Sequence, residues 1–152
     1  MKKIITKPFM PLSMYKMVEK EDEYEIYLKG GKISYLPKSI ILDRDVSWLL
    51  GLWIGDNYSS KNGTKPTKSK INTSGRFGVI NNDLDIIEKV IMVFRKMNLK
   101  NIKVDIILPR NNNVNFDNIQ VKFEKFNPNI YNGSQWRKEI GVSVYINNTS
   151  FL

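Results

Sequence analysis

The sequence predicts an α+β domain preceded by a short extension, with an antiparallel sheet that carries helices on one face. Several short segments alternate apolar and polar residues, which is typical of strands with one buried face. Two longer segments repeat apolar residues at helical spacing and lie between these strands along the chain. With 152 residues, of which 41% are hydrophobic, the chain is long enough to bury one core.

Residues 1–40 are interpreted as an N-terminal extension, and residues 41–152 as the main domain. Within the extension, "EYEIYLKGGKISYLP" alternates on both sides of Gly30 and Gly31, which predicts a hairpin over about residues 24–36 with a two-residue turn. Alternation places Ile26 on one face of the first strand, and Ile33 with Tyr35 on one face of the return strand.

The segment "LDRDVSWLLGLWIGD" predicts a helix with Asp43 as N-cap and Asp45 in the first turn. Ser47, Gly51 and Gly55 recur every fourth residue and so form one row of small side chains on this helix. Each glycine costs about 1 kcal/mol of helix propensity. Close packing of a second helix against the row would offset that cost, and two incidental glycines in a buried helix are the alternative.

Asp56 lies where this helix ends, and the negative end of a helix disfavours a carboxylate. The acid is therefore expected to be solvated, paired with a lysine, or bound to a divalent cation together with carbonyl oxygens of the helix end.

The rest of the chain predicts a polar loop or a loose hairpin over residues 59–75, a strand "RFGVIN", and an amphipathic helix capped by Asn82 or Asp83. Three further strands are predicted from alternation in "NIKVDIILP", "NIQVKFEKF" and "IGVSVYIN". Their polar faces are expected to be wet, because antiparallel sheets commonly pack on one side only.

Composition narrows the chemistry. Lys and Arg number 24 against 15 Asp and Glu, a net charge of +9, which favours a polyanionic partner over a merely lysine-rich soluble protein. Cys and His are both absent, so disulfides, the usual zinc sites, and Ser-His or Cys-His catalysis are excluded. No run reaches the length of a membrane span and no secretory signal is evident, which predicts an intracellular protein, cytoplasmic or organellar, without a membrane partner.

The nonamer "LLGLWIGDN", residues 49–57, resembles the signature of the LAGLIDADG homing endonucleases. The segment "RFGVINNDLDIIEKVIMVFRKM" resembles the following part of the same repeat, and the resemblance extends over roughly residues 40–148. It implies a helix-strand-strand-helix-strand-strand unit, with Gly51 and Gly55 at the contact between two such helices and a saddle-shaped sheet over DNA.

The resemblance also implies a function, namely a sequence-specific endonuclease that hydrolyses double-stranded DNA with Mg²⁺. Asp56 is then the catalytic and metal-binding acid, and the carbonyl of Gly55 is a further metal ligand. Because the chain has one copy of the motif, a complete site implies a homodimer or a second LAGLIDADG half, and a symmetric pair implies a pseudo-palindromic target.

DNA contacts are expected from the acid-free basic stretch after the helix and from polar faces of the predicted strands. A flexible solvated loop is the alternative for the basic stretch. The candidate residues are Lys61, Lys65, Lys68, Lys70, Arg76, Lys103, Gln120 and Lys122.

Three features depart from the family pattern. Asn57 replaces the usual final Gly, Gly78 stands where members often carry a polar residue near the scissile phosphate, and the chain ends at "NNTSFL", about where another helix would begin. The last two favour an alternative on the same fold, a non-catalytic DNA- or RNA-binding protein such as a decayed endonuclease or an intron-splicing maturase. A third hypothesis is an oligomeric structural protein without affinity for nucleic acid.

Overall fold

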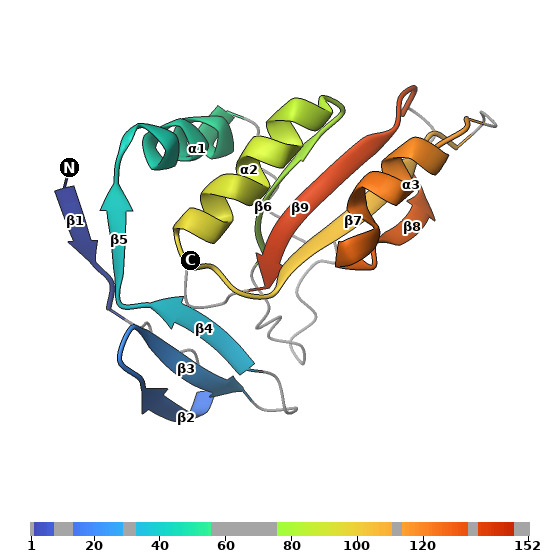
Figure 1. The fold of residues 1–152 in the computed structure, drawn as a ribbon. Coiled ribbons are helices and arrows are strands. Elements are labelled where there is room, and N and C mark those ends of the chain that lie inside the picture. Colours follow the sequence, from blue (N-terminus) through green and yellow to red (C-terminus); the bar gives the residue numbers. More distant parts are fainter. Residues whose placement is uncertain are drawn as a thin grey trace, which may run out of the picture.

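The computed structural model describes residues 2–7, 14–28, 33–55, 76–110, 114–133 and 137–147. These residues form a mixed α+β fold (Figure 1). In chain order, the elements are β1 (Lys2–Ile5), β2 (Met14–Glu19), β3 (Glu23–Leu28), β4 (Ile33–Pro37), β5 (Ser39–Leu42), α1 (Arg44–Gly55), β6 (Arg76–Asn81), α2 (Leu84–Lys96), β7 (Ile102–Leu108), α3 (Asp117–Phe123), the 3-10 helix η1 (Glu124–Phe126), β8 (Asn129–Asn132) and β9 (Gly141–Asn147).

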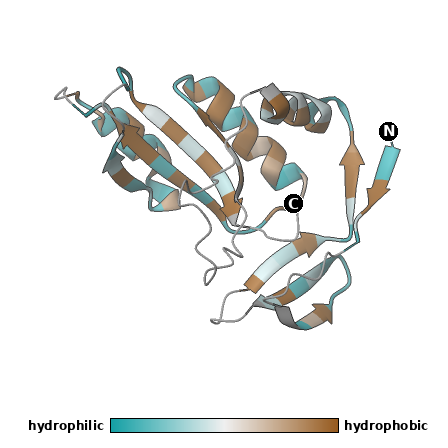
Figure 2. Cartoon of the chain, turned by 180° about the vertical axis from the view of Figure 1, so that it is seen from behind, coloured by the Kyte–Doolittle hydropathy of each residue, from teal (hydrophilic) through white to brown (hydrophobic). Residues whose placement is uncertain are grey.

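The main sheet has the strand order β6-β9-β7-β8 in the described part of the chain. Strand β9 is antiparallel to both of its neighbours, whereas β8 runs parallel to β7. The buried face of α2, with Ile87, Val90 and Phe94, joins Val79 and Val144 of the sheet in one apolar core. Apolar bands alternate along β9 (Figure 2), whereas β7 ends in an unbroken apolar run of Ile106, Ile107 and Leu108.

Helix α2 begins at Asp83, whose carboxylate accepts hydrogen bonds from the backbone N–H groups of Asp85 and Ile86, so the predicted cap is confirmed. At its other end, Asn98 adopts a left-handed conformation with a φ of 56°. The backbone N–H groups of Asn98 and Leu99 donate to carbonyls of the last turn and close the helix there.

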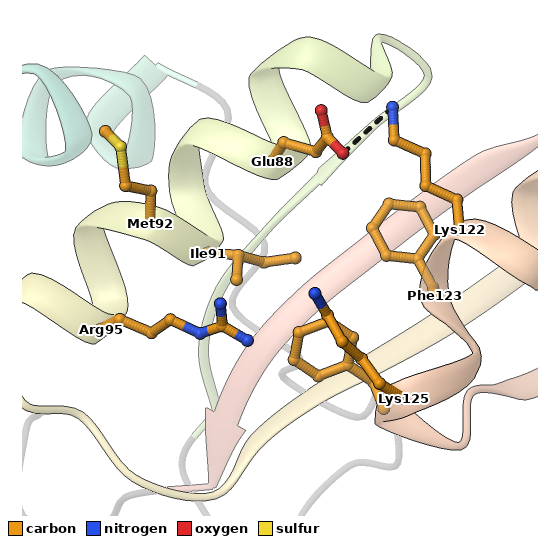
Figure 3. Close-up of a pocket in the computed structure, with 8 residues that line it drawn as sticks. Glu88, Ile91, Met92, Arg95, Lys122, Phe123 and Lys125 are labelled. Atoms are coloured by element: carbon orange, nitrogen blue, oxygen red, sulfur yellow. Dashed lines mark ion pairs between the residues drawn. The ribbon is translucent and has the colours of Figure 1, made fainter.

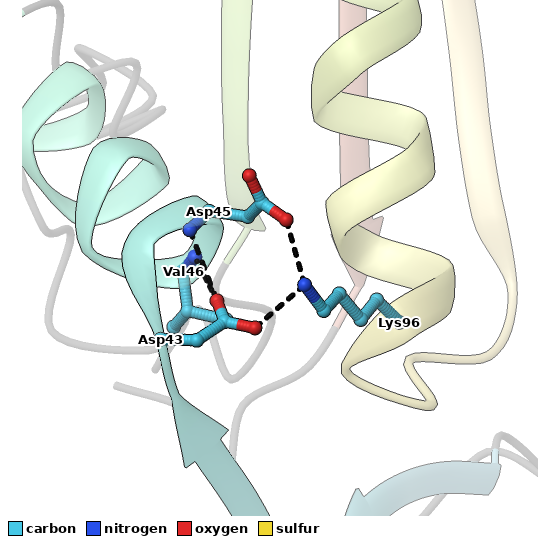
Figure 4. A network of polar contacts seen from close by, with 4 residues as sticks. All are labelled: Asp43, Asp45, Val46 and Lys96. Atoms are coloured by element: carbon cyan, nitrogen blue, oxygen red, sulfur yellow. Dashed lines mark hydrogen bonds and ion pairs between the residues drawn. The ribbon is translucent and has the colours of Figure 1, made fainter. Parts of the chain in front are cut away.

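Helix α1 is fixed at its N-terminus by the predicted cap. The Asp43 carboxylate accepts hydrogen bonds from the N–H groups of Asp45 and Val46, each at 3.0 Å. Lys96, the last residue of α2, places its Nζ 2.6 Å from a carboxylate oxygen of Asp43 and 2.6 Å from one of Asp45 (Figure 4). This clip joins the start of α1 to the end of α2.

The clip predicts a pH-dependent contribution to stability. The hydrogen bond from Lys96 lowers the pKa of Asp43 below 3.8, and Asp43 and then Asp45 raise the pKa of Lys96 above 10.5. The Asp43 contribution is present above pH 3.8 and is lost as the pH falls through the lowered pKa. The Lys96 contribution is present below pH 10.5 and is lost as the pH rises through the raised pKa.

We therefore expect Lys96→Met to lower the free energy of unfolding at pH 7, with a deficit that shrinks below pH 3.8 and at strongly alkaline pH. Urea titrations followed by tryptophan fluorescence measure this difference. Lys89→Met is the matched control, because Lys89 lies on the same helix and pairs with no acid in the described part. A Lys96→Met deficit that is equal at pH 3 and pH 7 would contradict the ion pair.

The N-terminal strands form two smaller sheets. Strand β1 pairs antiparallel with β5, and β2, β3 and β4 form a three-stranded antiparallel sheet. This sheet confirms the predicted hairpin, and Ile33 and Tyr35 share one face of its return strand as predicted, which is the less buried face. Ile26 pairs with Ser34, so Ser34 and Leu36 are buried while Ile33 is 38% exposed. The turn itself lies outside the described residues, and the described pairs are one residue out of the register that a two-residue turn at Gly30 and Gly31 would set.

The segment "NIQVKFEKF" is not a strand, and the prediction there was wrong. It forms α3 and η1, because Ile119, Phe123 and Phe126 recur at helical spacing and pack against the main core. Val121, which alternation would have buried, is 70% exposed. The strand that follows, β8, was not predicted. No described helix is long and apolar enough to cross a membrane.

Candidate functional site

Helix α1 has one buried and one open face. Val46 and Leu49 are 2% and 0% exposed and belong to the main core. The centre of the Trp53 ring lies 5.3 Å from the centre of the Phe77 ring in β6. These contacts orient the helix, and the clip at Lys96 fixes its start. The opposite face is therefore presented away from the core.

The row of small residues lies on the open face. Ser47 and Gly51 are exposed, and a Cβ added to Gly51 would meet no atom within 4 Å outside its own helix. Ile54, on the same side, is 75% exposed, which is unusual for a large apolar side chain. Gly51 thus does not serve packing against the chain's own core.

Gly55 is the last residue of α1, and Asp56 follows it outside the described residues. The last turn of α1 contains no basic residue, so no side chain of the helix itself neutralises the negative end of its dipole. Carbonyl and carboxylate oxygens are hard donors of the kind that Mg²⁺ prefers, so the residue types at this helix end are compatible with that ion. Elsewhere in the described part, no three His, Cys, Asp or Glu side chains are grouped as a metal site.

Comparison of the chain with family models, curated proteins and solved structures gave no match. The site is therefore assigned from its own residues and their surroundings.

The predicted DNA contacts do not share one surface. Lys103 lies on β7, exposed, and alternates with the core residue Val104, so it is on the sheet face away from the helices. Gln120 and Lys122 are exposed on α3, which packs through Phe123 on the helical side. Lys103 lies on a strand as predicted, whereas the prediction of a strand at Gln120 and Lys122 was wrong, because residues 118–126 are helical.

The basic residues of the loop predicted after α1 lie outside the described residues. Arg76 begins β6, and its side chain is likewise not described. The loop residues in question are Lys61, Lys65, Lys68 and Lys70.

The sheet face away from the helices is not an open polar surface at its centre, contrary to the prediction. Asp105, Ser143 and Tyr145 are 4%, 1% and 4% exposed. The Asp105 carboxylate accepts a hydrogen bond of 2.9 Å from the side-chain amide of Asn129 in β8. Arg137 lies directly against this face at Gly141. Lys103 of β7 is exposed on the same face, beside these buried residues.

Gly78 occupies the position on β6 that pairs with Tyr145. A Cβ there would stand 2.4 Å from the Tyr145 Cβ and 2.4 Å from the Val144 carbonyl oxygen. The strand pair leaves no room for any side chain at residue 78.

Sequence reasoning also missed a basic groove between α2 and the α3–η1 segment. Arg95, Lys125 and Phe126 meet there. The available signal was the helical spacing of Ile119, Phe123 and Phe126, which brings Lys122 and Lys125 toward α2 once the segment is read as a helix.

Proposed function

We propose that the chain is a divalent-metal-dependent, sequence-specific DNA endonuclease of the homing type, active as a homodimer or with a second LAGLIDADG half. The observation that carries the proposal is the open face of α1. Its row of small residues faces away from the core and runs to Gly55, immediately before the acid Asp56. A second copy packed on that row would bring two acids together at the shared helix ends.

In this dimer, the Gly55 carbonyl and the Asp56 carboxylate of each copy would hold Mg²⁺. Bound there, the ion would activate water and stabilise the charge that develops on phosphate. The chain's own contribution is to position Gly55, the residue before the acid, because the start of α1 is held by its cap and by Lys96.

Asn57 in place of the usual Gly is compatible with this proposal. The chain ends other helices on asparagine: Asn98 follows α2 with a φ of 56°, and Asn127 follows η1 with a φ of 46°. Asparagine tolerates the left-handed conformation that terminates a helix.

Asp56→Asn tests the proposal, because it removes the carboxylate and keeps the size of the side chain. With Mg²⁺, the wild-type chain is expected to linearise members of a plasmid library that carries randomised pseudo-palindromic inserts. Cleavage by Asp56→Asn should fall at least about a hundredfold, the loss typical of one electrostatic group in an active site. Binding of the recovered target, measured by gel shift, should persist.

Asp85→Asn is the matched control, since it makes the same chemical change in an exposed carboxylate in the first turn of α2, on the helical side of the sheet. Cleavage that survives Asp56→Asn would reject the assigned site, and equal losses in both variants would show that the effect is not local.

A second candidate function, a non-catalytic nucleic-acid-binding protein on the same fold, is favoured by Gly78. Close packing of β6 against Tyr145 excludes a polar side chain at that position. Salt-dependent binding of duplex DNA or structured RNA, with no nicking in Mg²⁺ or Mn²⁺, would select this function.

A further inference from the structure

The groove between α2 and the α3–η1 segment has an apolar floor and a basic rim. Ile91 and Phe123, 6% and 1% exposed, lie at its base, and Met92 at the edge is 51% exposed. Its volume is about 230 Å³. A groove of this size accommodates a small charged group with part of a flat or apolar body.

Two cations of this groove stand over the same aromatic ring. The Arg95 guanidinium carbon lies 5.6 Å from the centre of the Phe126 ring, and the Lys125 Nζ lies 5.5 Å from it. Their head groups point toward one another (Figure 3). Neither forms an ion pair with an acid in the described part of the chain. Two like charges held together repel unless an anion lies between them.

The acid that lines the groove does not supply that anion. Glu88 lies at the other end, where its carboxylate is 3.1 Å from the Lys122 Nζ (Figure 3). With Arg95, Lys122 and Lys125 against Glu88, the groove carries a net charge of +2. The positive charge is concentrated at Arg95 and Lys125.

We propose that this groove binds the phosphate group of a nucleotide, either free or within a nucleic-acid strand. A phosphate offers several oxygens, so it can accept from the planar guanidinium of Arg95 and from Lys125 at once. The sugar or base would cover the apolar floor and Met92. The site lies on the helical side of the sheet and does not depend on the proposed role of Asp56, so either proposal can fail alone.

Calorimetry with AMP, and fluorescence anisotropy with a labelled oligo(dT) strand, test both sources of the phosphate. Arg95→Gln and Lys125→Gln are each expected to weaken binding of the phosphate carrier about tenfold or more, as the loss of a hydrogen bond to a charged group does. Lys89→Gln is the matched control, because it removes one charge from α2 at a position over Trp48, away from the groove. Adenosine, which lacks the phosphate, should not bind.

Phe126→Leu separates the built site from a merely basic surface. It keeps both cations and most of the apolar volume, yet removes the ring that gathers them, so binding should weaken as in Arg95→Gln. The proposal is overturned by any of four results: binding of neither probe at millimolar concentration, equal affinity for adenosine and AMP, equal losses from Lys89→Gln, or tighter binding of an oligoglutamate peptide. Binding of AMP alone would identify a free nucleotide, and binding of the strand alone a nucleic acid.

Discussion

If the proposed function holds, Gly51→Leu is expected to yield a chain that folds normally but dimerises and cleaves DNA far more weakly than the wild type. In the isolated chain, the added side chain enters open space, since a Cβ at Gly51 meets no atom within 4 Å outside the helix. Leucine also favours a helix by nearly 1 kcal/mol over glycine, so the free energy of unfolding of the monomer should rise slightly. Between two helices in contact, the same side chain overpacks the interface.

The expected loss in the interface is large. Overpacking costs about 1–3 kcal/mol per inserted side chain, and a symmetric dimer carries the substitution twice. The dissociation constant should therefore rise more than about tenfold, because 1.4 kcal/mol corresponds to tenfold. Sedimentation velocity over a range of concentrations measures the change in mass, and cleavage by the two chains is compared at equal concentration.

The control is Arg44→Leu, which places the same side chain on the exposed start of α1, one turn before Ser47 and far from Gly55. It should leave the dimer much less affected. A Gly51→Leu chain that sediments and cleaves like the wild type would remove the helix interface from the proposal, and with it the reason for Asp56 to work as a pair.

Features determined by local chemistry were predictable from sequence. Asp43 and Asp83 cap their helices as predicted, because a short side chain before an apolar helical repeat has few other roles. The hairpin formed by β3 and β4 was predictable from alternation around glycines. In each case the residues that decide the structure lie within a few positions of one another.

Features determined by distant packing were not predictable in this way. "NIQVKFEKF" satisfies a period of two and a period of 3.6 equally well, and only the core that receives Ile119, Phe123 and Phe126 decides for the helix. The parallel partner of β7, the short β8, has a fully exposed burial pattern and so carries no apolar signal. Asp105 and Ser143 look like residues of a wet strand face, yet both are buried.

The candidate site divides along the same line. The spacing of Ser47, Gly51 and Gly55 was visible in the sequence. Which side of α1 faces the core was not, because apolar residues lie on both sides of this row. The core contacts of Val46 and Leu49 decide that direction. The groove at Arg95 depends on α2, α3 and η1 meeting: helical spacing predicts the α3–η1 segment, but no local pattern predicts that this segment lies beside α2.

Gly78→Ala is expected to lower the free energy of unfolding by about 3 kcal/mol, more than alanine at Gly51, Gly133 or Gly141. The new Cβ would lie 2.4 Å from the Val144 carbonyl oxygen, 2.4 Å from the Tyr145 Cβ and 2.7 Å from the Tyr145 Cα. These atoms belong to the backbone of β9 or are bonded to it, so no rotamer change relieves the overlap. Urea denaturation of Gly78→Ala and Gly51→Ala should give shifts of opposite sign, since alanine at Gly51 gains about 1 kcal/mol.

Tyr145→Phe gives a sharper test of the cause. It removes the hydroxyl and keeps the Cβ, so Gly78→Ala should cost the same in that background as in the wild type. If Gly78→Ala costs less stability in the Tyr145→Phe background, the tyrosine hydroxyl causes the overlap, and residue 78 can carry a side chain. If the cost is unchanged, no polar group can be placed at residue 78 without moving β9. Any DNA cleavage by this chain must then occur without a polar side chain at residue 78. The comparison of cleavage by the wild type and by Asp56→Asn therefore decides between the two proposed functions.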